Sequence, residues 1–144
     1  MPTQSLFSLA STLAMLGWIL LLVFHKTLWI SKVLTGTLIA FFALLYTWLI
    51  ATNLGSFTMD SFNSLDNIAT LFQSREALLA GWIHYLAFDL FTGIYIVNDA
   101  RKQGFTIWLL LPCLFFTFMF GPFGLLLYLL LRWFKSGSWF GYNE

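Results

Sequence analysis

Two ionisable side chains, His84 and Asp89, lie in the middle of an apolar stretch from Ala77 to Val97, which reads ALLAGWIHYLAFDLFTGIYIV. An ionisable group at membrane depth is costly, so it normally faces a partner, a cavity or a transport pathway. Histidine and carboxylate side chains are also the groups that most often give and take protons in catalysis. This stretch is therefore the first candidate for a functional site.

Helical spacing separates the two residues. Successive residues of an α-helix turn by about 100°, so Trp82, Tyr85 and Asp89 share one face, while His84 is about 140° away from Asp89. The small residues near His84 invite close approach of a neighbouring helix. We therefore expect His84 to face a helix–helix contact and Asp89 to face another contact or a cavity. In a purely structural role, His84 would bond a backbone carbonyl and Asp89 a tyrosine, tryptophan or threonine.

The composition indicates an integral membrane protein. Of the 144 residues, 60% are hydrophobic and only 9% are charged, against about 25% charged in a typical soluble domain. The net charge of +1 and the lack of a basic run give no reason to expect nucleic acid. Cys113 is the only cysteine, which excludes an internal disulfide and a cysteine-based metal site. A haem is set aside because His25 lies at the membrane edge and His84 near the middle, and a di-iron site needs more histidines than the two present. No metal site is therefore predicted, and the cofactor stays open.

The elements that position these residues are predicted to be four membrane spans, because a span needs about 20 apolar residues. The short loops make consecutive spans antiparallel neighbours, so the fold class is all-α, a polytopic four-helix transmembrane bundle. Ser74 is the expected N-cap of the third span. One domain, 1–135, holds all the spans, and 136–144 is a short polar and aromatic tail. The spans are about 6–24, 33–52, 77–97 and 106–131.

Residues 54–73, between spans two and three, are polar enough to lie outside the apolar core. Within them Leu65, Ile68 and Phe72 recur at helical spacing, which predicts a short interfacial helix. It is either a linker folded onto the membrane surface or a lid over a cavity between the spans.

The fourth span contains Pro112 and the string GPFG, Gly121 to Gly124. At about 1.5 Å per residue it is roughly 39 Å long, more than the ~30 Å apolar core, so we expect a kink at GPFG. Unwound backbone there could also line a binding site. Counting back from the loop puts GPFG at the level of residues 79–82, near His84, and 113–117 at the level of Asp89.

The loops hardly determine orientation. Four Lys and Arg residues fall on one side of a four-span bundle and three on the other. This slightly favours both termini outside the cytoplasm.

Four strings resemble the abscisic-acid-deficient-four family, the plant neoxanthin-synthase-type proteins and their bacterial relatives. The resemblance covers about residues 60–131, and its most distinctive parts are GWxHYLAFDL and GPxGLL. The strings are FNSLDNIATLF, ALLAGWIHYLAFDLFTG, NDARKQG and LPCLFFTFMFGPFGLLLY.

The plant members are four-span membrane proteins needed to convert an epoxy-carotenoid into its allenic isomer. The resemblance thus implies a hydrophobic polyene or isoprenoid ligand taken from the bilayer. It implies that Asp89 is the acid and His84 the base of an isomerase-like reaction. The residues that match the family's polar string and its second motif are then candidates for substrate binding: Trp82, Tyr85, Asp99, Gly121, Pro122 and Gly124.

Two functions remain open. One is an enzyme that rearranges or oxidises a carotenoid or related isoprenoid, and the other is a non-catalytic membrane protein that binds a carotenoid or lipid and presents it to a separate enzyme. The sequence shows no transit peptide, so we expect the bacterial cytoplasmic (inner) membrane. The expected partners are the lipid bilayer, the polyene ligand, and a second copy of the chain or a partner enzyme.

Overall fold

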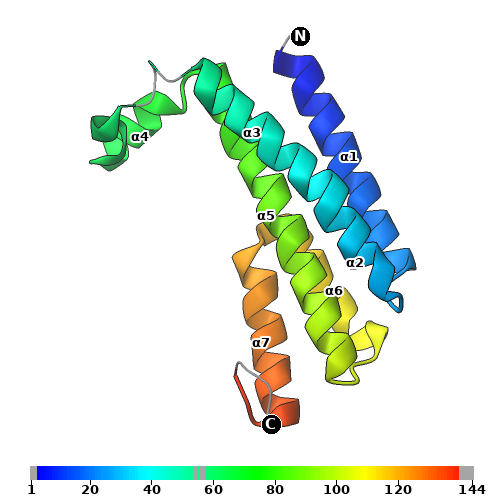
Figure 1. Ribbon diagram of the computed structural model, residues 1–144. Helices are drawn as coiled ribbons and strands as arrows, with labels where there is room; N and C mark the ends of the chain where they lie inside the picture. The colour runs from blue at the N-terminus through cyan, green and yellow to red at the C-terminus, as the bar shows by residue number, and fades with distance from the viewer. Residues whose placement is uncertain (1–2, 54, 56–57, 140–144) are drawn as a thin grey trace.

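The structure is a computed structural model that describes residues 3–53, 55 and 58–139, and the described part is entirely helical (Figure 1). Its elements are α1 (Thr3–Val23), α2 (Leu28–Leu34), the π-helical turn η1 (Thr35–Ile39), α3 (Ala40–Thr52), the 3-10 turn η3 (Met59–Phe62), α4 (Leu65–Leu71), α5 (Arg75–Lys102), α6 (Ile107–Phe120) and α7 (Pro122–Ser136).

Three helices in the described residues are long and apolar enough to cross a membrane: Thr3–Val23, Leu28–Thr52 and Arg75–Lys102, of 21, 25 and 28 residues. They correspond to the first three predicted spans. The second is continuous through α2, η1 and α3. The chain is thus a membrane protein with an all-helical fold, while the four-span bundle is not confirmed.

Helix α5 is the central element. Over its most apolar 18 residues, 56% are buried, against 33% in α1 and 17% in the Leu28–Thr52 helix. It contributes to both apolar clusters, one with α1 and α3 and one with α1, α2, α6 and α7. The helix begins at Ser74, whose side chain accepts from the Ala77 backbone N–H, as predicted. Because α5 is surrounded, its polar side chains are the ones that become buried.

The prediction that the fourth span is a single kinked helix is wrong. It consists of α6 and α7, which pack side by side and run in opposite directions, so that α7 returns toward the end of α5 from which α6 departed (Figure 1). The 14 residues of α6 measure about 21 Å, too short for the ~30 Å core. The two helices therefore form a hairpin that enters the bundle part-way and turns back.

The GPFG string makes this reversal. Gly121 has φ +42° and ψ −91°, a conformation that side chains other than hydrogen rarely allow. Pro122 opens α7, where its missing N–H costs nothing. A Cβ on Gly124 would collide with the backbone of Thr117 and Cys113, so the absence of a side chain lets α7 lie directly on α6. The location of the break was predicted, but its sharpness was not.

The open end of the hairpin is fastened to the end of α5. The Tyr128 hydroxyl donates to Asp99 Oδ2 at 2.5 Å, and Arg132 Nε lies 2.8 Å from the same oxygen. Lys135 Nζ donates to the Gly104 carbonyl at 2.7 Å. The start of α1 and the end of α7 accordingly lie at opposite ends of the bundle (Figure 1), whereas four spans would put them on one side.

The segment between α3 and α5 contains the predicted short helix, α4, which begins at the N-cap Ser64. It projects away from the bundle (Figure 1), and the side chain of Leu65 is 80% exposed. Such an apolar side chain on a projecting helix suits a membrane surface. Its interfacial location stays a prediction, as does the single domain 1–135. The last residues of the tail, 140–144, lie outside the described residues.

Candidate functional site

Asp89 lies at the closed end of the hairpin, beside the turn. Its residue is only 8% exposed, and a Cβ built on Gly121 would collide with the Asp89 carboxyl. Among the described residues, Asp89 Oδ2 is buried and has no hydrogen-bond partner. A buried polar atom without a partner is unusual in a native fold and needs an explanation. Close approach of backbone to this carboxyl is the reason that position 121 requires glycine.

Tyr85, one turn earlier on α5, also contacts the hairpin next to its turn. Its hydroxyl contacts two carbonyls in the last turn of α6, Met119 O at 2.7 Å and Phe118 O at 3.2 Å. The last carbonyls of a helix have no partner within the helix, so the tyrosine satisfies groups that the break at Gly121 releases. Tyr85 therefore holds the hairpin turn against α5 next to Asp89.

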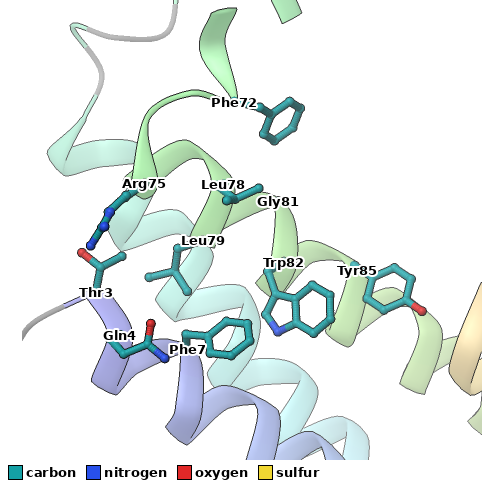
Figure 2. Close-up of a pocket in the computed structure, with 10 residues that line it drawn as sticks. All are labelled: Thr3, Gln4, Phe7, Phe72, Arg75, Leu78, Leu79, Gly81, Trp82 and Tyr85. Carbon is teal, nitrogen blue, oxygen red and sulfur yellow. The ribbon is translucent and has the colours of Figure 1, made fainter. Parts of the chain in front are cut away.

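An apolar pocket of about 590 Å³ adjoins Tyr85 between α1 and α5 (Figure 2). Its wall includes the stacked rings of Trp82 and Tyr85, with centroids 5.4 Å apart, and Phe7, 5.4 Å from Trp82. Its outer end carries polar groups on Arg75 and on the first turn of α1 (Figure 2). The lining residues are Thr3, Gln4, Phe7, Phe72, Arg75, Leu78, Leu79, Gly81, Trp82 and Tyr85.

A second apolar groove, of about 360 Å³, lies between α1 and α6. The two hollows lie along the same face of α1, and Tyr85, which lines the first, contacts the backbone carbonyl of Phe118, which lines the second. The Trp82 indole N–H donates to Ser11 Oγ at 3.0 Å and so joins α5 to α1 between the two hollows. Two separate apolar hollows thus lie along one face of α1, and the Trp82–Ser11 hydrogen bond lies between them. The second groove is lined by Met15, Trp18, Ile19, Leu22, Leu111, Leu114, Phe115 and Phe118.

A comparison with protein families matches residues 5–128 to the ABA4-like family, described as ABA DEFICIENT 4-like. The chain belongs to this family. The match begins in α1 and ends at Tyr128, so it includes both walls of the pocket and the hairpin turn. It extends the sequence resemblance, which covered only about residues 60–131. Searches of curated proteins and of solved structures give no significant match.

His84 is not part of this site. It is exposed, its ring stacks on Phe88 at 4.5 Å between centroids, and it lies 5.8 Å from the ring of Tyr46 on α3. The predicted level of GPFG beside residues 79–82 is wrong, because the string meets Asp89 instead. The count took the third span to end at residue 97, whereas α5 continues to Lys102 and α6 begins only at Ile107. Within the described residues, no group of three or more His, Cys, Asp or Glu side chains is close enough to hold a metal ion.

The remaining predicted binding residues divide by location. Trp82 and Tyr85 line the pocket, Gly121 and Pro122 form the turn, and Gly124 permits helix packing. Asp99 lies at the open end of the hairpin, away from the pocket residues, in contact with Tyr128 and Arg132.

Sequence reasoning missed the pocket wall on α1 and the partners of Asp99. Phe7 and Gln4 look like ordinary members of an apolar span, and Arg132 resembles a flanking cation. No local pattern pairs Arg132 with Asp99, because the pairing depends on the reversal at Gly121. The available signal was the glycine directly before a proline in GPFG, because this pair allows a sharper change of chain direction than a kink needs.

Proposed function

We propose that this protein binds a carotenoid or related isoprenoid along α1 and rearranges or oxidises it beside Asp89. The observation that carries the proposal is the buried Asp89 carboxyl, whose Oδ2 has no partner among the described residues and which lies one helical turn from Tyr85, a residue that lines the pocket. A carboxyl in an apolar site is suited to exchange a proton with a ligand. Membership of the ABA DEFICIENT 4-like family supports a carotenoid-related role.

The combined length of the two hollows supports a long ligand. Their lining residues on α1 extend from Thr3 to Leu22, about 29 Å at 1.5 Å per residue. An extended C40 polyene is comparable in length to the ~30 Å apolar core of a bilayer. Aromatic side chains such as Trp82 and Phe118 offer flat faces on which a conjugated chain can stack.

The reaction that this site suits best is an isomerisation. An epoxide next to a polyene becomes an allenic alcohol when its oxygen gains a proton, its carbon–oxygen bond breaks and the adjacent polyene carbon loses a proton. Atoms and electrons balance without an oxidant. Asp89 is the group in place to move a proton, and the base role for His84 has no support from geometry, because His84 lies on another face of α5.

A non-catalytic binding protein is the second candidate. It is favoured by the hydroxyl of Tyr85, which donates to the Met119 and Phe118 carbonyls and so holds the hairpin turn rather than a ligand. In this role the protein would present the ligand to a separate enzyme in the same cytoplasmic membrane. The largely exposed Leu28–Thr52 helix offers a face for lipid, for a second copy or for that enzyme.

Expression in a carotenoid-producing bacterium, followed by chromatography of extracted pigments, separates the two candidates. For an enzyme we expect a new pigment that disappears in Asp89→Asn and persists in His84→Ala. For a binding protein we expect unchanged pigments and a carotenoid that co-purifies with the chain. A host pigment profile that does not change, together with purified protein free of pigment, would refute the carotenoid role itself.

A further inference from the structure

The charged side chains are divided very unequally between the two ends of the bundle. Six of the seven Lys and Arg residues belong to the end where α1 meets α2, α5 meets α6, and α7 finishes (Figure 1). The other end has Arg75 together with Asp60, Asp66 and Glu76. The six basic residues are Lys26, Lys32, Arg101, Lys102, Arg132 and Lys135.

Contacts tie together, at one end of the bundle, the elements that carry these six residues. Ser31 Oγ donates to Asn98 Oδ1 at 2.7 Å, which ties α2 to the end of α5. Arg101 Nη1 donates to the His25 carbonyl at 3.4 Å, which ties the first loop to the same end. Lys135 reaches the Gly104 carbonyl from α7. The hairpin is what moves Arg132 and Lys135 to this end.

Short loops rich in Lys and Arg stay on the cytoplasmic side of a membrane, and acidic residues have little influence on the choice. With a fourth span, four Lys and Arg residues would lie on one side of the membrane and three on the other. With the hairpin the ratio is six to one, and it is five to one when Arg132 is set aside because Asp99 neutralises it. The charge distribution therefore decides the orientation once the reversal at Gly121 is known.

We propose that the chain crosses the membrane three times, with the start of α1 outside the cytoplasm and the hairpin entering from the cytoplasmic side, so that the Trp82 pocket opens in the outer leaflet. The polar groups at the pocket's outer end, on Arg75, Thr3 and Gln4, then lie at the outer interface. A hydrophobic ligand enters from outer-leaflet lipid and meets Asp89 near the middle of the bilayer. The identity of the ligand rests on the proposed function, but the orientation does not.

Single-cysteine labelling tests the orientation. Cys113 is buried, so a Cys113→Ala chain serves as the unlabelled background. Into it we would introduce Gln4→Cys, Gln73→Cys, Gln103→Cys and Ser138→Cys, one at a time. Intact cells and inverted membrane vesicles would each be treated with a membrane-impermeant maleimide.

We expect Gln4→Cys and Gln73→Cys to react in intact cells, and Gln103→Cys and Ser138→Cys to react only in inverted vesicles. Reaction of Gln73→Cys and Ser138→Cys from the same side would restore the fourth span and overturn the proposal. Reaction of Gln103→Cys from outside would invert the orientation and overturn it too. Reporter fusions at the two termini of the unsubstituted chain should report opposite sides, and a shared side would also contradict it. None of these readouts requires pigment, so a failure of the carotenoid role leaves them interpretable.

Discussion

Asp89 and Asp99 are two carboxyls on one helix, and the same hairpin contacts both, yet their surroundings differ completely. Both are buried, with 8% and 4% of their surface exposed. Asp99 meets the open end of the hairpin and is bound by Tyr128 and Arg132. Asp89 meets the closed end and retains an oxygen without a partner among the described residues. One carboxyl fastens the hairpin, and the other is left available beside its turn.

The energetic difference follows from the cost of burying charge. A buried carboxylate is stable only when it is paired and hydrogen-bonded, as Asp99 is. An unpaired one is a liability that natural proteins retain mainly where it serves a function. Substitution of Asp99 should therefore reduce stability more than substitution of Asp89, and substitution of Asp89 should affect function more.

The largest loss of stability should come from Arg132→Met. It leaves the Asp99 carboxylate buried without its cation, which costs about 3–5 kcal/mol. Unfolding of the purified protein by denaturant in detergent would measure it. Arg75→Met, the same substitution at an exposed arginine, is the matched control and should cost less than about 1 kcal/mol. Equal losses would show that the Asp99 pair does not fasten the hairpin.

Gly121→Ala should come next. Alanine is strained at φ +42°, and its Cβ would collide with the Asp89 carboxyl, so we expect a cost of about 1–3 kcal/mol. Gly36→Ala is the control, because nothing lies within 4 Å of its added Cβ and it lies inside a helix. It should be neutral or slightly stabilising. Equal thermal denaturation midpoints for the two variants would argue against the tight turn.

Two tyrosine substitutions compare the open and the closed end of the hairpin directly. Tyr128→Phe removes the donor to Asp99 and should cost about 1–3 kcal/mol, because the acceptor is charged. Tyr85→Phe removes a bond to neutral carbonyls and should cost only about 1 kcal/mol. Denaturant unfolding of both would rank them, and the reverse order would place the stronger attachment at the closed end.

The smallest effect should come from His84→Ala. This side chain is exposed and makes only ring contacts with Phe88 and Tyr46, so the variant should lose less than about 1 kcal/mol. Any pigment product should be retained. Loss of the product with unchanged protein yield would show that His84 takes part in the reaction and would weaken the assignment of proton transfer to Asp89.

Much of this comparison was predictable from sequence, because local patterns carry it. Apolar length predicted the first three spans, Ser74 marked the start of α5, and helical spacing placed Tyr85 and Asp89 on one face apart from His84. The GPFG break was also evident. What could not be predicted was the direction of the chain after Gly121, since apolar length alone cannot distinguish one kinked span from two short antiparallel helices.

The predictions that depended on the direction of α7 were therefore wrong as well. The side on which α7 ends and the partners of Asp99 both follow from whether α7 continues outward or returns. The pocket was missed for a different reason, because its α1 wall consists of residues such as Phe7 that carry no chemical signature. Only their packing against Trp82 reveals them.

Thermal unfolding of Asp89→Asn and Asp99→Asn, measured side by side in one detergent, tests the comparison most directly. Both substitutions are nearly isosteric and replace a carboxyl by an amide, so they differ only in what surrounds the carboxyl. We expect the Asp89→Asn midpoint to stay at or above that of the unsubstituted protein, and the Asp99→Asn midpoint to fall markedly because Arg132 loses its counter-charge. Equal decreases, or a larger decrease for Asp89→Asn, would contradict the division into a fastening carboxyl and an available one.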